Sequence, residues 1–321
     1  MTSATPVFFH LLADRGGVPG ALLFDCPAVA ASAVVDIAPL AALAANFPCV
    51  FHADAPVAVA AGLGEAGWQP LAPEGVHRSD DAFSTSLPPA VQWVTGDWCL
   101  APPLKNPGNK GASRALALQL VQLVAADADT HEIEALLRRD PTLSYHLLRL
   151  VNSLGVGTSR RVTSFAQALL ILGRQQLRRW LNLMLFAAGE GDVRSAMLLA
   201  RVAVRARAME SLARALGLDK QMQEMAFMTG MFSLLGILFG RPLAEVLQPL
   251  AIGELVQAAL LSHQGELGAL LTVIETAEAG RLGDVAAQLA ALQLGVDEFN
   301  AIVIDANGWM LGVLGESASH A

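Results

Sequence analysis

The hydrophobic pattern of this chain changes once, near residue 103, and this change limits the folds that the chain can adopt. Before it, PVFFHLLA and GALLFDC flank the turn-forming DRGG and predict a hairpin of two strands. Residues 38–46 predict a helix, PCVFHAD a strand, APVAVAAGLGEAG a helix and VQWVTGDWCL a last strand. This alternation indicates an α/β segment, although four or five strands are too few for an eight-stranded barrel.

After the Pro- and Gly-rich segment PPLKNPGNKGAS, the pattern is helical to the end of the chain. Asp129 with Glu132 and the pair Asp140-Pro141 are typical of helix starts. Further helices are expected over residues 192–216, 221–239, 252–261, 266–279, 282–293 and 297–313. We therefore predict an α+β chain with a small α/β region over 1–105, a linker over 106–112 and a large all-α helical domain over 113–321.

The charge and the cysteines narrow the class of protein. A net charge of −8 argues against a chain whose main task is to neutralise phosphates, so no direct nucleic-acid partner is expected. Cys26, Cys49 and Cys99 form no CxxC pair, which indicates reduced thiols. The start of the chain lacks a basic signal region, so a cytoplasmic location is expected. The uncharged run 225–240 is shorter than the roughly 20 residues of a membrane span, so no membrane insertion is expected.

Motifs for metal, nucleotide or nucleophile chemistry are not found. No two of the seven histidines lie within four residues of each other, so HxxxH and HExxH pairs are missing. The sequence also has no GxSxG and no GxxxxGK[ST], and no cofactor is expected. Arg174, Arg178 and Arg179 are candidate anion or partner contacts because guanidinium groups match phosphate oxygens; the alternative is a solvated helix face.

Two segments carry a resemblance to a known family. IEALLRRDPTLSYHLLRLVNS and SFAQALLILGRQQLRRWL closely resemble the HDOD domain, a relative of the HD-type phosphohydrolases that lacks their hydrolytic metal site. The resemblance continues through AFMTGMFSLLGILFGRPLAEVL and ALLSHQGELGALLTVIETAEAG to Trp309. It implies mainly structural roles for the signature residues Asp140, Pro141, Arg149, Asn152, Ser153, Ser164 and Gly173.

The resemblance also bears on activity. In catalytic HD relatives, a histidine and an aspartate hold metal ions at the positions that read Ser233 and Leu234 here. GMFSLLG and LSHQGELGALL look like the subfamily in which an EAL domain, a barrel that hydrolyses cyclic di-GMP with metal-bound water, precedes HDOD. The residue in place of that barrel's strand glutamate is Ala21. The resemblance therefore implies a shortened, degenerate EAL-like N-terminal region, no metal and a protein that is not an enzyme.

The resulting expectation is a non-catalytic bacterial signal-transduction protein, linked to cyclic di-GMP or to stress and motility signalling. It would act through protein–protein interaction, with another signalling or regulatory protein as its partner. The alternative is a sensor that binds a nucleotide such as cyclic di-GMP without cleaving it. The low content of charged residues, 16%, favours association, so a homodimer is a further expectation.

Overall fold

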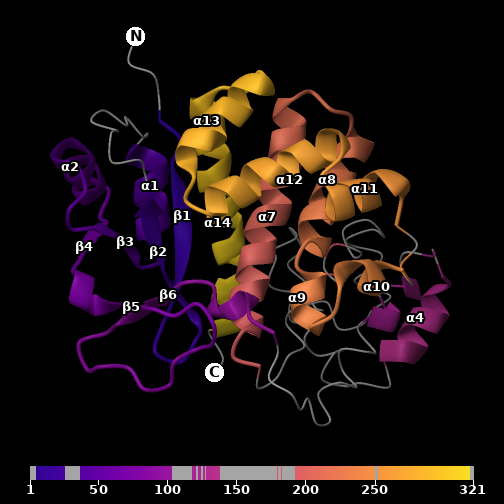
Figure 1. Ribbon diagram of the computed structural model, residues 1–321, viewed down its shortest axis with the longest axis horizontal. Coiled ribbons are helices and arrows are strands. Elements are labelled where there is room, and N and C mark those ends of the chain that lie inside the picture. The colour runs from indigo at the N-terminus through magenta and orange to yellow at the C-terminus, as the bar shows by residue number, and fades with distance from the viewer. Residues whose placement is uncertain are drawn as a thin grey trace, which may run out of the picture.

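A computed structural model describes residues 5–25, 37–102, 118–120, 122–123, 126, 128–137, 179, 182, 192–248, 250 and 252–318. Within these residues a mixed β-sheet packs against a large layer of helices, which confirms the α+β class (Figure 1). Because the sheet is a substantial layer, the description all-α does not fit the chain as a whole. The strands are β1 Phe8–Ala13, β2 Pro19–Asp25, β3 Cys49–His52, β4 Gln69–Leu71, β5 Val76–Arg78 and β6 Trp93–Thr95.

The predicted hairpin is β1 and β2, which pair antiparallel with Phe8 opposite Asp25. The Asp14 carboxylate closes the turn by accepting hydrogen bonds from the backbone N–H groups of Gly16 and Val18, at 2.8 and 3.0 Å. Gly17 has a φ of 83°, a conformation that favours glycine. Local turn chemistry therefore determines this part of the fold.

The sheet has the strand order β4-β3-β2-β1-β6-β5. β2, β3 and β4 are parallel, as are β5 and β6, while β1 is antiparallel to both of its neighbours. All strands except β1 therefore run in one direction. Helices α1 Ile37–Ala44 and α2 Val57–Glu65 connect the parallel strands β2, β3 and β4, as the βα alternation predicts.

The two edge strands, β4 and β5, are joined by only four residues, 72–75. Such a link spans at most about 18 Å, whereas six flat strands would separate the edges by about 24 Å. The sheet must therefore curl into a half-barrel. Side chains from both edges meet inside it, in a small apolar cluster made of Leu12, Ala21, Leu23, Val50, Leu71, Val76 and Trp93.

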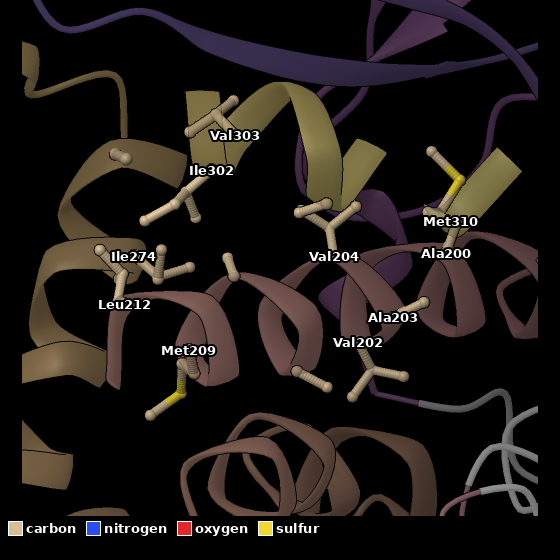
Figure 2. Close-up of a cluster of buried hydrophobic side chains, with 14 of the residues drawn as sticks. Ala200, Val202, Ala203, Val204, Met209, Leu212, Ile274, Ile302, Val303 and Met310 are labelled. Atoms are coloured by element: carbon tan, nitrogen blue, oxygen red, sulfur yellow. The ribbon is translucent and has the colours of Figure 1, made fainter. Parts of the chain in front are cut away.

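The helical layer is organised around α7, a helix of 21 residues. Ala200, Val204 and Met209 are among the many side chains that it buries, and Figure 2 shows them with Ile274 of α12 and Val303 of α14. The described helices after the sheet are α4 Thr130–Leu137, α7 Ser195–Ala215, α8 Lys220–Phe232, α9 Leu235–Phe239, α10 Leu243–Leu247, α11 Glu254–Ser262, α12 Gly265–Glu278, α13 Leu282–Ala291 and α14 Val296–Ala318.

Sheet and helices share one hydrophobic core, which includes Phe9 and Phe24 from the strands and Met209 from α7. The segment before β1 is also fixed to α14 at residues 5–7: Asn300 accepts a hydrogen bond from the Val7 N–H at 2.9 Å and donates one to the Thr5 carbonyl at 3.0 Å. The predicted linker 106–112 lies outside the described residues, and the domain boundary stays a prediction.

Four features of the structure differ from the sequence-based expectation. β4 and β5 fall in or beside the stretch 71–89, which shows no periodicity because each strand has only three residues. The five-residue α10 is equally short and was also not expected. The single helix expected over 221–239 is broken into α8 and α9 at Ser233 and Leu234, where the Ser233 hydroxyl donates to the Gly230 carbonyl at 2.8 Å.

The segment Lys220–Phe239 is long and apolar enough for a membrane span by length and composition. In the structure 56% of its apolar window is buried inside the protein, and the break between α8 and α9 interrupts it. This packing is typical of a core helix.

Candidate functional site

The strongest concentration of buried charge lies where α7 meets α12. The Arg205 guanidinium of α7 donates two parallel hydrogen bonds to the Glu278 carboxylate of α12, from Nε to Oε1 at 2.6 Å and from Nη2 to Oε2 at 2.7 Å. Its Nη1 donates to the Ser233 hydroxyl at 2.9 Å and lies 3.4 Å from Glu275 Oε1. This bidentate geometry is the strongest form of ion pair between side chains, and it joins α7, α12 and the α8–α9 junction.

Both members of the pair are charged despite their burial. Burial by itself would raise the pKa of Glu278, but the charge and hydrogen bonds of Arg205, with smaller effects of Arg201 and His10, lower it below the ordinary value. Burial would likewise lower the pKa of Arg205, and Glu278 and Glu275 raise it instead. A largely buried ion pair of this kind is stable only when each partner stays in place.

The charges continue from this pair in two directions. His263, in the left-handed conformation directly after α11, lies 2.8 Å from Glu275 through its Nε2. On the sheet side, His10 Nε2 lies 3.0 Å from Asp25 Oδ2. Arg201, one helical turn before Arg205, donates from Nη2 to Asp97 Oδ1 at 3.2 Å. The network therefore extends from two strands through α7 and α12 to the α11–α12 turn.

A second cluster surrounds Arg179, one of the three candidate anion contacts. Its Nη2 donates to Glu210 at 2.9 Å, and its guanidinium also bonds Glu224 and lies 4.2 Å from the centre of the Phe227 ring. The structure thus gives Arg179 an intramolecular role. Arg174 and Arg178 lie outside the described residues, so their contact with an anion or partner stays a prediction.

The positions that the resemblance compares with metal ligands do not fit a metal ion. Ser233 accepts a hydrogen bond from the cationic Arg205, and Leu234 is buried in the apolar core. Ala21 is fully buried inside the curled sheet, next to Leu12 and Leu23. Within the described ranges, no group of three or more His, Cys, Asp or Glu side chains could hold a metal ion. The signature residues Asp140, Pro141, Arg149, Asn152, Ser153, Ser164 and Gly173 lie outside the described residues.

Sequence reasoning missed the Arg205 network, although the sequence contains a signal for it. Arg201 and Arg205 are four residues apart in the apolar stretch MLLARVAVRARAM, and such spacing places both on one face of a helix. A helix that is apolar on nearly every side is expected to be buried, and buried arginines need carboxylate partners. The identity of those partners, on α12 and after β6, cannot be read from the sequence.

Comparisons with known proteins give a family match for part of the helical region and relatives for a larger part of the chain. Residues 114–245 match the HDOD domain family. The chain is 27% identical over 233 residues to the cyclic di-GMP phosphodiesterase CdgJ of Vibrio cholerae. This match covers 72% of the chain and 54% of that protein. It is 29% identical over 175 residues to the uncharacterized protein YuxH of Bacillus subtilis, covering 54% of this chain and 42% of that protein. The chain thus spans about half the length of the curated relatives that it matches.

One solved structure is also similar, a Shewanella amazonensis SB2B crystal structure named "Putative phosphohydrolase". It has a TM-score of 0.45 and 17% identity, and the match covers 64% of this chain and 93% of that one.

These findings correct one expectation and confirm another. The expectation that the chain is not an enzyme is contradicted by the Vibrio cholerae relative, whose name is that of a phosphodiesterase. The family match begins at residue 114, so the likeness of residues 1–105 to an EAL domain stays a prediction. The helical resemblance is confirmed for residues 114–245, which match the HDOD domain family.

Proposed function

We propose that this chain acts in cyclic di-GMP signalling. The observation that carries the proposal is the match over 233 residues to a protein named as a cyclic di-GMP phosphodiesterase. Because the match spans only 54% of that protein, its activity and its partners are proposals for this chain.

The first candidate mode of action is the binding of another signalling or regulatory protein by the HDOD domain. Two features support it. The described arginines of the α7 face, Arg201 and Arg205, are engaged in internal ion pairs, as is Arg179. The described helices also form one continuous apolar core, which gives a rigid frame for a docking surface. A degenerate EAL-like N-terminal region is part of this proposal, and the cytoplasm is its proposed location.

The second candidate is hydrolysis of cyclic di-GMP, which the name of the Vibrio cholerae relative favours. Hydrolysis of one phosphodiester bond by an activated water would yield the linear dinucleotide. If the mechanism uses a metal ion, the described residues cannot supply all of its ligands, because they contain no group of three or more His, Cys, Asp or Glu side chains that could hold one. Such ligands could come from the undescribed part of the chain, from a second copy or from a partner.

One set of measurements on the purified chain separates these modes. Chromatography after incubation with cyclic di-GMP and Mg²⁺ or Mn²⁺ detects the linear product, and calorimetry detects nucleotide binding. Affinity capture with mass spectrometry detects a partner protein. Turnover would show hydrolysis, and binding without turnover would show a nucleotide sensor. A chain that neither binds nor cleaves cyclic di-GMP, and captures no protein of that signalling network, would contradict the proposed function.

A further inference from the structure

Two strands end against the helical layer. Asp25 is the last residue of β2, and its Oδ2 lies 3.6 Å from the Cβ position of Gly280, two residues after α12. Asp97 follows β6 by two residues and accepts a hydrogen bond from Arg201 of α7. Since β2 and β6 run in the same direction, both contacts belong to the carboxyl ends of the strands. In α/β sheets this is the edge at which ligands bind, and here α7 and α12 cover it.

Arg201 is held at this edge in an unusual way. Its side chain is largely buried, and its Nη1 is inaccessible to water and has no hydrogen-bond partner among the described residues. Within the described part of the chain, its one hydrogen bond to a carboxylate is the 3.2 Å bond from Nη2 to Asp97. Arg205, four residues later, carries the same charge but is balanced by the bidentate bond to Glu278. Asp97 is therefore the carboxylate that hydrogen-bonds Arg201, while the charge of Glu278 acts on Arg201 without a hydrogen bond between them.

The two pairs also differ in their access to solvent. Asp97 is 58% exposed, whereas Glu278 is 12% exposed. Water and salt ions can therefore reach and weaken the Asp97–Arg201 contact, while the Arg205–Glu278 pair is screened much less. The Asp97 carboxylate makes no cap hydrogen bond to the short helix 98–100 that it precedes. Among the described residues, Arg201 is its only hydrogen-bond partner.

From this arrangement we propose that the Asp97–Arg201 contact is a latch that holds the carboxyl edge of the sheet closed against α7. When the contact breaks, the Arg201 guanidinium is left buried without a carboxylate bonded to it, a state with a large desolvation penalty. The penalty is relieved if the segment 97–102 separates from α7 and water reaches the guanidinium. Release of the latch would hydrate the covered edge, and the Arg205–Glu278 pair would keep α7 and α12 together. The latch stands independently of the signalling role proposed above.

Hydrogen–deuterium exchange of the full chain, read by mass spectrometry, tests the latch with the variant Asp97→Asn. The matched control is Asp305→Asn, because Asp305 also binds an α7 arginine, Arg207, at 2.8 Å and is 53% exposed. We expect Asp97→Asn to raise the exchange rate of amides in 98–101 and 22–25 by about tenfold, through local opening. Asp305→Asn should leave these amides at the wild-type rate. Equal exchange in the two variants would overturn the proposal.

Two further measurements keep the test decisive if Asp97→Asn folds poorly. Asp97→Glu retains the charge and should keep exchange in 98–101 within a factor of about three of the wild type. In the wild-type chain, raising KCl from about 0.05 M to about 1 M should increase exchange in 98–101, because salt screens an exposed pair. Amides in the middle of α7 should not respond to salt. Salt-independent exchange in 98–101 would refute the latch.

Discussion

Gly230 of α8 lies so close to Ala206 of α7, where the two helices cross, that a Cβ on Gly230 would be 2.6 Å from the Ala206 Cα atom. Backbone atoms cannot yield as a flexible side chain can, so an added methyl group must push the two helices apart. α7 and α8 are central to the core, and only glycine permits this distance.

The substitution Gly230→Ala should therefore destabilise the chain by about 1–3 kcal/mol, through overpacking of the helix crossing. Gly62→Ala is the control, because Gly62 also lies in a helix, α2, and has nothing within 4 Å of its Cβ position. That change should stabilise by about 0.5–1 kcal/mol, since alanine favours helix more than glycine does. Urea unfolding measures both; a similar small effect at the two positions would show that the crossing is not tight.

Arg205→Met should reduce the free energy of unfolding by about 3–5 kcal/mol, because it leaves Glu278 charged and buried. The double variant Arg205→Met/Glu278→Met removes both charges and should recover much of that loss. The exposed pair Arg281–Asp284, 3.4 Å apart, supplies a control: Arg281→Met should cost less than about 1 kcal/mol. Additive costs for the two single variants of the buried pair would contradict the described coupling.

Stability should also depend on pH through Glu278. Its pKa in the folded chain lies below the ordinary 4.5, because the Arg205 charge outweighs the effect of burial. The ionised form therefore stabilises the fold fully above pH 4.5, and this contribution declines as the pH falls below 4.5 through the lowered pKa. Thermal unfolding between about pH 3 and pH 6 should show a smaller loss for Glu278→Gln than for the wild type. Parallel curves for the two proteins would argue against a charged Glu278.

Cys49 and Cys99 should be unreactive in the folded chain. Burial raises the pKa of Cys49 to about 12. The pKa of Cys99 is also raised, and burial is the main cause. Alkylation requires the thiolate, which is scarce at pH 8 for such groups. Iodoacetamide at pH 8 should leave both residues unmodified in the native chain and label both in urea, as peptide mass spectrometry would show. Fast labelling of Cys99 without denaturant would mean that the junction of sheet and α7 opens readily.

Much of the element order follows from local chemistry. The hairpin of β1 and β2 is predictable because an Asp and two glycines suffice for its turn, and α12, α13 and α14 because apolar side chains recur with helical period over ten or more residues. The Asp219 carboxylate also marks the start of α8 by accepting a hydrogen bond from the Met222 N–H at 2.8 Å. Such signals involve residues close in sequence, so they need no knowledge of the fold.

By itself, the sequence determined the class of the fold, the position of most helices and the likeness to HDOD domains, because periodicity, caps and motifs are written along the chain. Only the tertiary structure decided that the sheet curls, because β6 pairs with the distant β1 and so places β4 and β5 at opposite edges of the sheet. It also decided that Arg205 meets Glu278, a residue 73 positions away. A buried charge needs a partner of opposite sign, but only the packing of α7 against α12 selects which one.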